Sequence, residues 1–224
     1  MMNTILIYFT ESTSKLSDYT FDHYLQKLPR SEQEKIKAFR RWEDAQSSLL
    51  GKMLLKKVLY DCTLGEQGLN QIQLTQFGRP YIDSAIDFNL THSGNYILCA
   101  STQNGRVGID IEKINPIQLA DYRSVFSKKE WDSIVNSPSP KIHFYKLWTI
   151  KEAVLKAQGN GLSFPPNQVE ALHTTINIEG KQWHYHTIEL NENYICHLAT
   201  DIICPEILLI QMNMNHLDEL LPAL

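Results

Sequence analysis

Two carboxylates, Asp110 and Glu112, are separated by one residue in the segment "RVGIDIEKI" (residues 106–114). Apolar residues alternate with them, which predicts a strand with one apolar face and one face that carries both carboxylates. Positions two apart on a strand have Cα atoms roughly 6.5–7 Å apart and point the same way. The two side chains could therefore converge on one hard cation. The simpler alternative is an outward polar face in contact with water.

A third carboxylate lies on a predicted helix at about residues 141–158. Trp148, Glu152 and Lys156 follow one another at i, i+4 spacing and so share one helix face. The simpler alternative is that Glu152 and Lys156 form an exposed ion pair, which stabilises the helix by roughly 0.2–0.5 kcal/mol. If Glu152 packs over the strand, three negative charges meet and repel one another unless a divalent cation joins them. Mg²⁺ accepts such oxygen ligands and usually also holds substrate phosphate, so we take a magnesium site as the working hypothesis.

The elements that must position these groups are short and of both kinds. Apolar spacing predicts two helices within residues 31–60, the first of which starts at the capping-box pattern "SEQE", and a short helix at 127–136. Strands are predicted at the N-terminal "MMNTILIYF", at 72–74, 88–90 and 96–102, and in "TTINI", "WHYHTIEL", "YICHLAT" and "EILLIQM". Helices precede strands in both halves, which predicts an α+β fold with two comparable lobes.

Composition narrows the class of protein. The chain has 224 residues, is 43% hydrophobic and carries a formal net charge of -4, which gives no general attraction to nucleic acid or acidic membranes. The four cysteines form no C-x-x-C pair, so we expect reduced thiols in a cytoplasmic protein. The N-terminal segment lacks the positive charge of a signal peptide, and its apolar run is too short to span a bilayer. We therefore expect neither nucleic acid nor membrane as a partner.

Two motifs together resemble a known family. "VGIDIEKI" and, some forty residues later, "FYKLWTIKEAVLKAQGNGL" are similar to the paired motifs of the 4'-phosphopantetheinyl transferases of the long, surfactin-synthetase-activating type. Further matching segments are "RRWEDAQSSLLGKMLL", "FGRPYI", "FNLTHSGNYILCA" and "VFSKKEWDSI". The resemblance implies two similar lobes related by a pseudo-twofold axis, each with helices packed on a small antiparallel sheet. It places residues 1–104 in one lobe and 105–224 in the other, with the site between them in a monomer.

The resemblance also implies a reaction. The enzymes of this family move the phosphopantetheine arm of coenzyme A onto a serine of an acyl or peptidyl carrier protein and release 3',5'-ADP. Asp110, Glu112 and Glu152 would then hold Mg²⁺ against the coenzyme A pyrophosphate. Lys156 and His92 would contact the same phosphates.

Other positions follow from the same resemblance. Lys35 and Arg79 are expected to contact phosphate, and Thr91 is expected near the nucleotide. Many relatives have lysine where this chain has Arg79, which keeps the charge but offers a bidentate fork. Ser47 replaces a frequent arginine and Glu32 a frequent lysine, so the affinity for coenzyme A is expected to differ.

Glu130 in "FSKKEW" has two interpretations. Ser127 and Glu130 form the S-x-x-E pattern of a capping box, in which the glutamate folds back onto the backbone. The resemblance instead places a glutamate here near the metal, where it could act as general base toward the carrier serine. We predict the catalytic role.

Two other functions remain as alternatives. A metal-dependent nucleotide or coenzyme A pyrophosphatase could use the same three carboxylates, with water in place of a protein acceptor. A non-catalytic module could bind metal through His184 and His186, although two alternating histidines lack the further ligands that zinc requires. By analogy, the segment 115–126, which includes Ile117, Leu119 and Tyr122, is expected to receive a helix of the carrier protein. Which carrier protein and which pathway are natural stays open.

Overall fold

The structure is a computed structural model that describes residues 3–65 and 68–213. The α-helices are α1 (Asp18–Gln26), α2 (Arg30–Lys37), α3 (Trp42–Leu59), α4 (Lys128–Val135) and α5 (Pro140–Gln158). The strands are β1 (Thr4–Glu11), β2 (Gln73–Leu74), β3 (Pro80–Tyr81), β4 (Ile86–Ser93), β5 (Tyr96–Gln103), β6 (Val107–Lys113), β7 (Thr175–Ile178), β8 (Lys181–Thr187), β9 (Tyr194–Thr200) and β10 (Glu206–Gln211). Within the two described ranges, no helix is long and apolar enough to cross a membrane.

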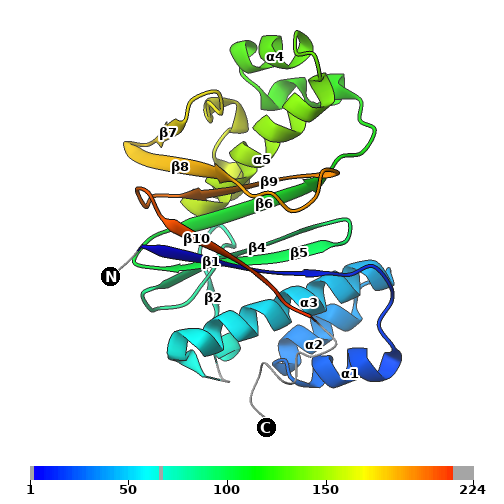
Figure 1. Cartoon of the computed structure of the whole chain (residues 1–224). Helices are drawn as coiled ribbons and strands as arrows, with labels where there is room; N and C mark the ends of the chain where they lie inside the picture. Colours follow the sequence, from blue (N-terminus) through cyan, green and yellow to red (C-terminus); the bar gives the residue numbers. More distant parts are fainter. Residues whose placement is uncertain (1–2, 66–67, 214–224) are drawn as a thin grey trace.

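Two four-stranded sheets lie at the centre of the molecule, and helices cover the outer face of each (Figure 1). One sheet has the order β10-β1-β5-β4 and packs against α3, with α1 and α2 beside it. The other has the order β6-β9-β8-β7 and packs against α5, with α4 at its far end. This arrangement confirms the predicted α+β fold with two comparable lobes.

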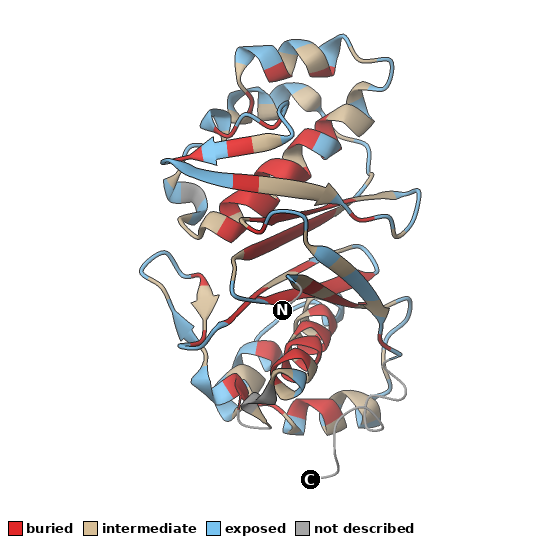
Figure 2. Ribbon diagram, turned by 60° about the vertical axis from the view of Figure 1, so that its left-hand side comes forward, coloured by how far each residue is buried: buried red, intermediate tan, exposed pale blue. Residues whose placement is uncertain are grey.

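Three apolar layers hold the stack together. Leu54 of α3 packs with Ile97 of β5 in the first lobe, and Val154 of α5 packs with Trp183 of β8 in the second. A third cluster, which includes Ile109, fills the space between the two sheets. Figure 2 shows this pattern as buried residues along α3, α5 and the central strands. The alternation predicted for residues 106–114 is therefore real, because the apolar face of β6 is the face that contacts the first sheet.

Strand β10 departs from the predicted division of the chain. It pairs in parallel with β1, with Glu206 opposite Thr4, so the first sheet is mixed rather than purely antiparallel. Residues 206–211 thus belong to the sheet of the first lobe, although the predicted boundary assigned them to the second. The remainder of the proposed division at 104/105 stays a prediction. Strand pairing across some 200 residues leaves no local mark in the sequence, because alternation sets a strand's faces but not its neighbour.

The two lobes also meet along β4 and β6, which are edge strands of their sheets. The two strands are joined through side chains of β4 rather than through its backbone. The side-chain oxygens of every second residue of β4 accept hydrogen bonds from the backbone N–H groups of every second residue of β6. The pairs are Val107 N to Asp87 Oδ2 (2.8 Å), Ile109 N to Asn89 Oδ1 (2.9 Å), Ile111 N to Thr91 Oγ1 (3.3 Å) and Lys113 N to Ser93 Oγ (3.0 Å). We call these four acceptors the side-chain ladder.

Candidate active site

Asp110 and Glu112 project from β6 toward α5, on the face opposite the apolar one. Gly108 allows the helix to come this close, since a Cβ atom there would lie 2.1 Å from the Ala153 carbonyl oxygen of α5. The close approach brings the face of α5 that carries Glu152 and Lys156 over the strand. The structure therefore places both predicted carboxylate sources in one region.

The charge of Asp110 acts on the other two carboxylates. Burial raises the pKa of Asp110, and the neighbouring Lys156 opposes this shift. Burial and then the charge of Asp110 raise the pKa of Glu112, while a hydrogen bond from Ser93 and another from Trp148 lower it. Burial and the charge of Asp110 also raise the pKa of Glu152. Each shift disfavours the ionised form; burial is the main cause for all three groups, and the charge of Asp110 adds to it for Glu112 and Glu152.

The donor set suits a hard cation. All three groups offer carboxylate oxygens, which Mg²⁺ prefers. Asp110 Oδ2 is buried and finds no hydrogen-bond partner among the described residues, which is unusual for a buried carboxylate. The type of ligand and the unpaired oxygen of Asp110 therefore fit Mg²⁺. Among residues 3–65 and 68–213, however, no three or more histidine, cysteine, aspartate or glutamate side chains lie close enough together to bind a metal ion as they stand.

Lys156 provides positive charge at the same place. Its Nζ donates to Asp110 Oδ1 at 2.6 Å and to the Ile109 carbonyl oxygen at 3.1 Å. The side-chain ladder supplies further donors, because the Thr91 hydroxyl lies 3.4 Å from Asp110 Oδ1 and the Ser93 hydroxyl donates to Glu112 at 2.9 Å. The same two hydroxyl groups therefore join the lobes and orient the carboxylates.

A pocket of about 270 Å³ opens next to this cluster and is lined by Thr91 and His92 together with residues of α3, among them Ser47 and Lys52. Partial desolvation and the nearby charge of Lys156 lower the pKa of His92, so the imidazole is neutral at pH 7. The structure brings the predicted Thr91, His92 and Lys156 to one place, between α3 and the carboxylates.

Lys35 lies apart from Thr91, His92 and Lys156, on the exposed face of α2. Its Nζ pairs with Glu32 Oε1 at 2.7 Å, and Lys52 Nζ pairs with Glu32 Oε2 at 2.9 Å. Burial opposes ionisation of Glu32, but the two lysines outweigh it and keep the pKa of that carboxyl below its ordinary value. The glutamate that replaces a frequent lysine thus holds two cations at the edge of the pocket.

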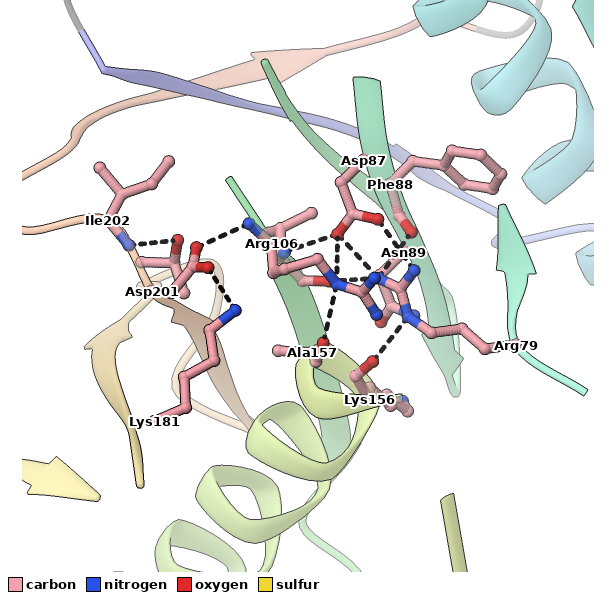
Figure 3. Close-up of polar contacts among 12 residues, drawn as sticks. Arg79, Asp87, Phe88, Asn89, Arg106, Lys156, Ala157, Lys181, Asp201 and Ile202 are labelled. Carbon is pink, nitrogen blue, oxygen red and sulfur yellow. Dashed lines mark hydrogen bonds and ion pairs between the residues drawn. The ribbon is translucent and has the colours of Figure 1, made fainter. Parts of the chain in front are cut away.

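Arg79 is placed differently from the expectation. Its side chain is 5% exposed and its two terminal nitrogens donate to the two oxygens of Asp87, each at 2.8 Å (Figure 3). Its Nε donates to the Lys156 carbonyl oxygen at 2.9 Å. In this arrangement Arg79 serves as a contact between β3, β4 and α5, and its predicted phosphate contact would require those bonds to be given up.

Glu130 lies in the core of the second lobe. It is completely buried and completes the predicted capping box, accepting from Ser127 N at 2.8 Å. It also accepts from Ala171 N and pairs with Lys151 Nζ, both at 2.8 Å. These contacts favour the structural interpretation over the general-base interpretation, and the catalytic role remains a prediction.

The other expected positions have partners of their own. Leu119 and Tyr122 are partly buried against the core of the second lobe, where the Tyr122 ring forms T-shaped contacts with the rings of Phe144 and Trp148. His186 Nε2 is buried without a hydrogen-bond partner in the described chain, and burial lowers the pKa of this histidine. His184 and His186 form part of no metal-binding group among the described residues.

Sequence reasoning missed the side-chain ladder and a buried histidine. The ladder could have been found, because "DFNLTHS" places polar residues at every second position from 87 to 93. His197 lies opposite Asp110 on β9, and its Nδ1 is 2.7 Å from Thr149 Oγ1 of α5. No local spacing marks that pair, which is 48 residues apart.

Comparison with known proteins identifies the family. Residues 15–104 match the family described as "4'-phosphopantetheinyl transferase, N-terminal", and residues 106–199 match the "4'-phosphopantetheinyl transferase superfamily". The 4'-phosphopantetheinyl transferase Sfp of Bacillus subtilis (strain 168) is 29% identical over 195 residues, which are 85% of this chain and 84% of that protein.

Two further relatives differ in how much they share. The 4'-phosphopantetheinyl transferase gsp of Aneurinibacillus migulanus is 30% identical over 161 residues, which are 71% of this chain and 68% of that protein. A solved structure of the holo-[acyl-carrier-protein] synthase of Thermotoga maritima overlaps 42% of this chain and 61% of its own, with 17% identity and a TM-score of 0.34. On the sequence matches, which extend through both lobes and include the carboxylate motifs, the chain belongs to the 4'-phosphopantetheinyl transferases of the Sfp type.

Proposed function

We propose that this enzyme transfers the 4'-phosphopantetheine arm of coenzyme A to a serine of an acyl or peptidyl carrier protein and releases 3',5'-ADP. One observation carries the proposal: in the two family motifs, Lys156 pairs with Asp110 and the charge of Asp110 acts on Glu152, beside a pocket lined by Thr91 and His92. A single chain supplies both lobes around this site, so we propose a monomer.

Asp110, Glu112 and Glu152 would hold Mg²⁺. When bound, the ion would neutralise charge on the coenzyme A diphosphate and on the leaving ADP. The carrier serine oxygen forms a bond to the β-phosphorus, the bond from that phosphorus to the ADP oxygen breaks, and the serine proton must be taken up by a base.

Lys156 and His92 would act on the phosphate oxygens. The ammonium group of Lys156, held at 2.6 Å from Asp110, is close enough to move onto a diphosphate whose charge exceeds that of one carboxylate. Neutral His92 can donate one hydrogen bond without adding charge. Both contacts would strengthen as negative charge builds on the leaving group, which lowers the barrier.

Mass spectrometry of a carrier protein incubated with coenzyme A and Mg²⁺ tests the proposal. We expect the carrier to gain the mass of the arm on its serine, and a carrier with that serine replaced by alanine to gain nothing. A pyrophosphatase would instead cleave coenzyme A and leave the carrier unmodified. That result would replace the transferase by the alternative function.

The proposed ligands are tested by Asp110→Ala, Glu112→Ala and Glu152→Ala. Each is expected to lower transfer by roughly 10²-fold or more, because each removes an interaction that stabilises the transition state. Asp132→Ala is a suitable control, since it removes a half-exposed carboxylate of the same lobe on α4. Near-normal transfer by all three variants would rule out the site.

A further inference from the structure

A buried ion pair lies next to the proposed site, where the C-terminal end of α5 meets the start of β6. Arg79 and Asp87 meet in a bidentate pair in which the side chains are 5% and 11% exposed. Parallel N–H···O bonds of this kind fix the relative orientation of both groups as well as their distance. The pair thus has a definite geometry that its neighbours can use.

The pair binds the end of α5 and the start of β6 at once. Arg79 Nε donates to the Lys156 carbonyl oxygen at 2.9 Å, and Arg106 Nε donates to that of Ala157 at 3.2 Å (Figure 3). The last carbonyl groups of a helix lack partners within it and carry its partial negative charge, so cationic donors stabilise them. Val107 is held from both sides, since its N–H donates to Asp87 and its carbonyl accepts from Arg79.

The residue whose carbonyl Arg79 holds is Lys156, which also carries the ammonium group of the proposed site. Its Nζ reaches Asp110 on β6 at 2.6 Å, while its backbone is fixed to β4 through the pair. Gly159 lets the helix end pack directly on Arg79, because a Cβ atom there would lie 2.9 Å from Arg79 Cδ. The position of Lys156 relative to Asp110 therefore depends on this contact.

We propose that Arg79 and Asp87 are positioning residues that set the place of Lys156, and that Arg79 does not bind the phosphates of coenzyme A. This inference rests on the proposed function. A guanidinium that holds a carboxylate and the backbone carbonyl groups of Lys156, Phe88 and Val107 has all three of its nitrogens engaged. A lysine at this position provides a single ammonium and cannot reproduce the set of contacts.

The test compares coenzyme A with 3'-dephospho-coenzyme A as donor for Arg79→Lys, Arg79→Gln and Asp87→Asn. We expect kcat to fall by roughly 10²-fold in all three, because a shift of about 1 Å in a positioning contact has an effect of that size. KM for coenzyme A should stay near the parent value, and the preference for coenzyme A over its dephospho form should be unchanged. A phosphate contact predicts the opposite: the Arg79 variants lose the preference and raise KM, whereas Asp87→Asn does neither.

Two controls separate positioning from unfolding. The double variant Arg79→Gln with Asp87→Asn leaves no unpaired charge in the protein interior, so it provides the same comparison if a single variant fails to fold. Its loss of kcat should match that of one single variant, because the two residues act as a unit. Lys181→Gln breaks the neighbouring ion pair between Lys181 Nζ of β8 and Asp201 Oδ2 (2.7 Å), removes no contact of Arg79 or Asp87, and should leave kcat unchanged.

A second readout does not depend on transfer. Amide hydrogen exchange in residues 155–158 of α5 should become faster in Asp87→Asn than in the parent, at a pH and temperature where both remain folded. Unchanged exchange together with unchanged kcat would overturn the inference. If the parent enzyme modifies no carrier, the proposed function fails, and the exchange experiment still decides whether the pair fixes the end of α5.

Discussion

Replacing Glu130 by glutamine separates a role in folding from a role in catalysis. The side chain is completely buried, and its carboxylate pairs at 2.8 Å with Lys151, whose side chain is 1% exposed. Lys151 also donates to the carbonyl oxygens of Pro166 and Val169. Burial lowers the pKa of Lys151 and the pairing with Glu130 opposes that shift, so this carboxylate favours the charged ammonium form.

The expected loss of stability follows from these contacts. Glutamine can still accept from Ser127 N and complete the capping box, but it leaves the Lys151 charge unpaired in the protein interior. Removing one partner of a buried ion pair lowers the free energy of unfolding by roughly 3–5 kcal/mol. For a chain of this length, each kcal/mol lowers Tm by about 2–4 °C. Glu130→Gln should therefore melt about 6–20 °C below the parent.

Thermal unfolding followed by circular dichroism, with transfer assayed well below both melting temperatures, provides the comparison. The structural role predicts a lower Tm and a transfer rate close to that of the parent. Glu130→Gln combined with Lys151→Met should recover most of the stability, because it removes both buried charges. A Glu130→Gln enzyme that melts with the parent but transfers roughly 10²–10⁴-fold more slowly would refute this reasoning and establish the general base.

Three further outcomes are expected. Lys156→Ala should lower transfer by roughly 10²–10³-fold, because it removes a positive charge beside Asp110. Lys141→Ala, which changes an exposed lysine at the start of the same helix, should leave transfer unchanged. Equal losses in the two variants would contradict the role of the helix face that carries Lys156. Glu32→Gln should lower KM for coenzyme A but not for its dephospho form, because it frees the ammonium groups of Lys35 and Lys52 for the 3'-phosphate. An unchanged KM would show that neither lysine contacts that phosphate. Burial, assisted by the charge of Lys146, lowers the pKa of His197 to about 4, so the unfolded chain takes up a proton below pH 6.5 that the native protein does not. Stability from this group should be complete above pH 6.5 and fall by up to about 3 kcal/mol as the pH drops to 4, and urea unfolding of His197→Gln should lack that part of the slope.

The parts of the site that lie on single elements could be predicted from the sequence. Alternation in β6 and the i, i+4 spacing in α5 are local properties, and each determines which side chains share a face. Asp110 with Glu112, and Glu152 with Lys156, were therefore assigned correctly to their faces. The close approach of the two elements depends on Gly108, whose small size is visible in the sequence but whose neighbour is not.

Partners at long range could not be predicted in this way. Arg79 has the charge of a phosphate ligand, yet its contacts lie 8, 28 and 77 residues away in the chain. A pattern that looks local can also depend on its surroundings. "SEQE" resembles a capping box, but α2 begins at Arg30 with Pro29 as its N-cap, so Ser31 lies inside the helix. The same pattern at Ser127 does form the box, because α4 begins one residue later.

The side-chain ladder explains why the site lies at the junction of the lobes. Two sheet edges could be joined by backbone hydrogen bonds, but those bonds would present only amide groups between the strands. A ladder of side chains satisfies the backbone of β6 and in addition brings hydroxyl groups to the carboxylates, as Thr91 does for Asp110 and Ser93 for Glu112. The contacts that hold the lobes together are thus the contacts that orient the proposed ligands. Any change that separates β4 from β6 should therefore disturb the site before it unfolds either lobe, because each lobe keeps its own apolar core.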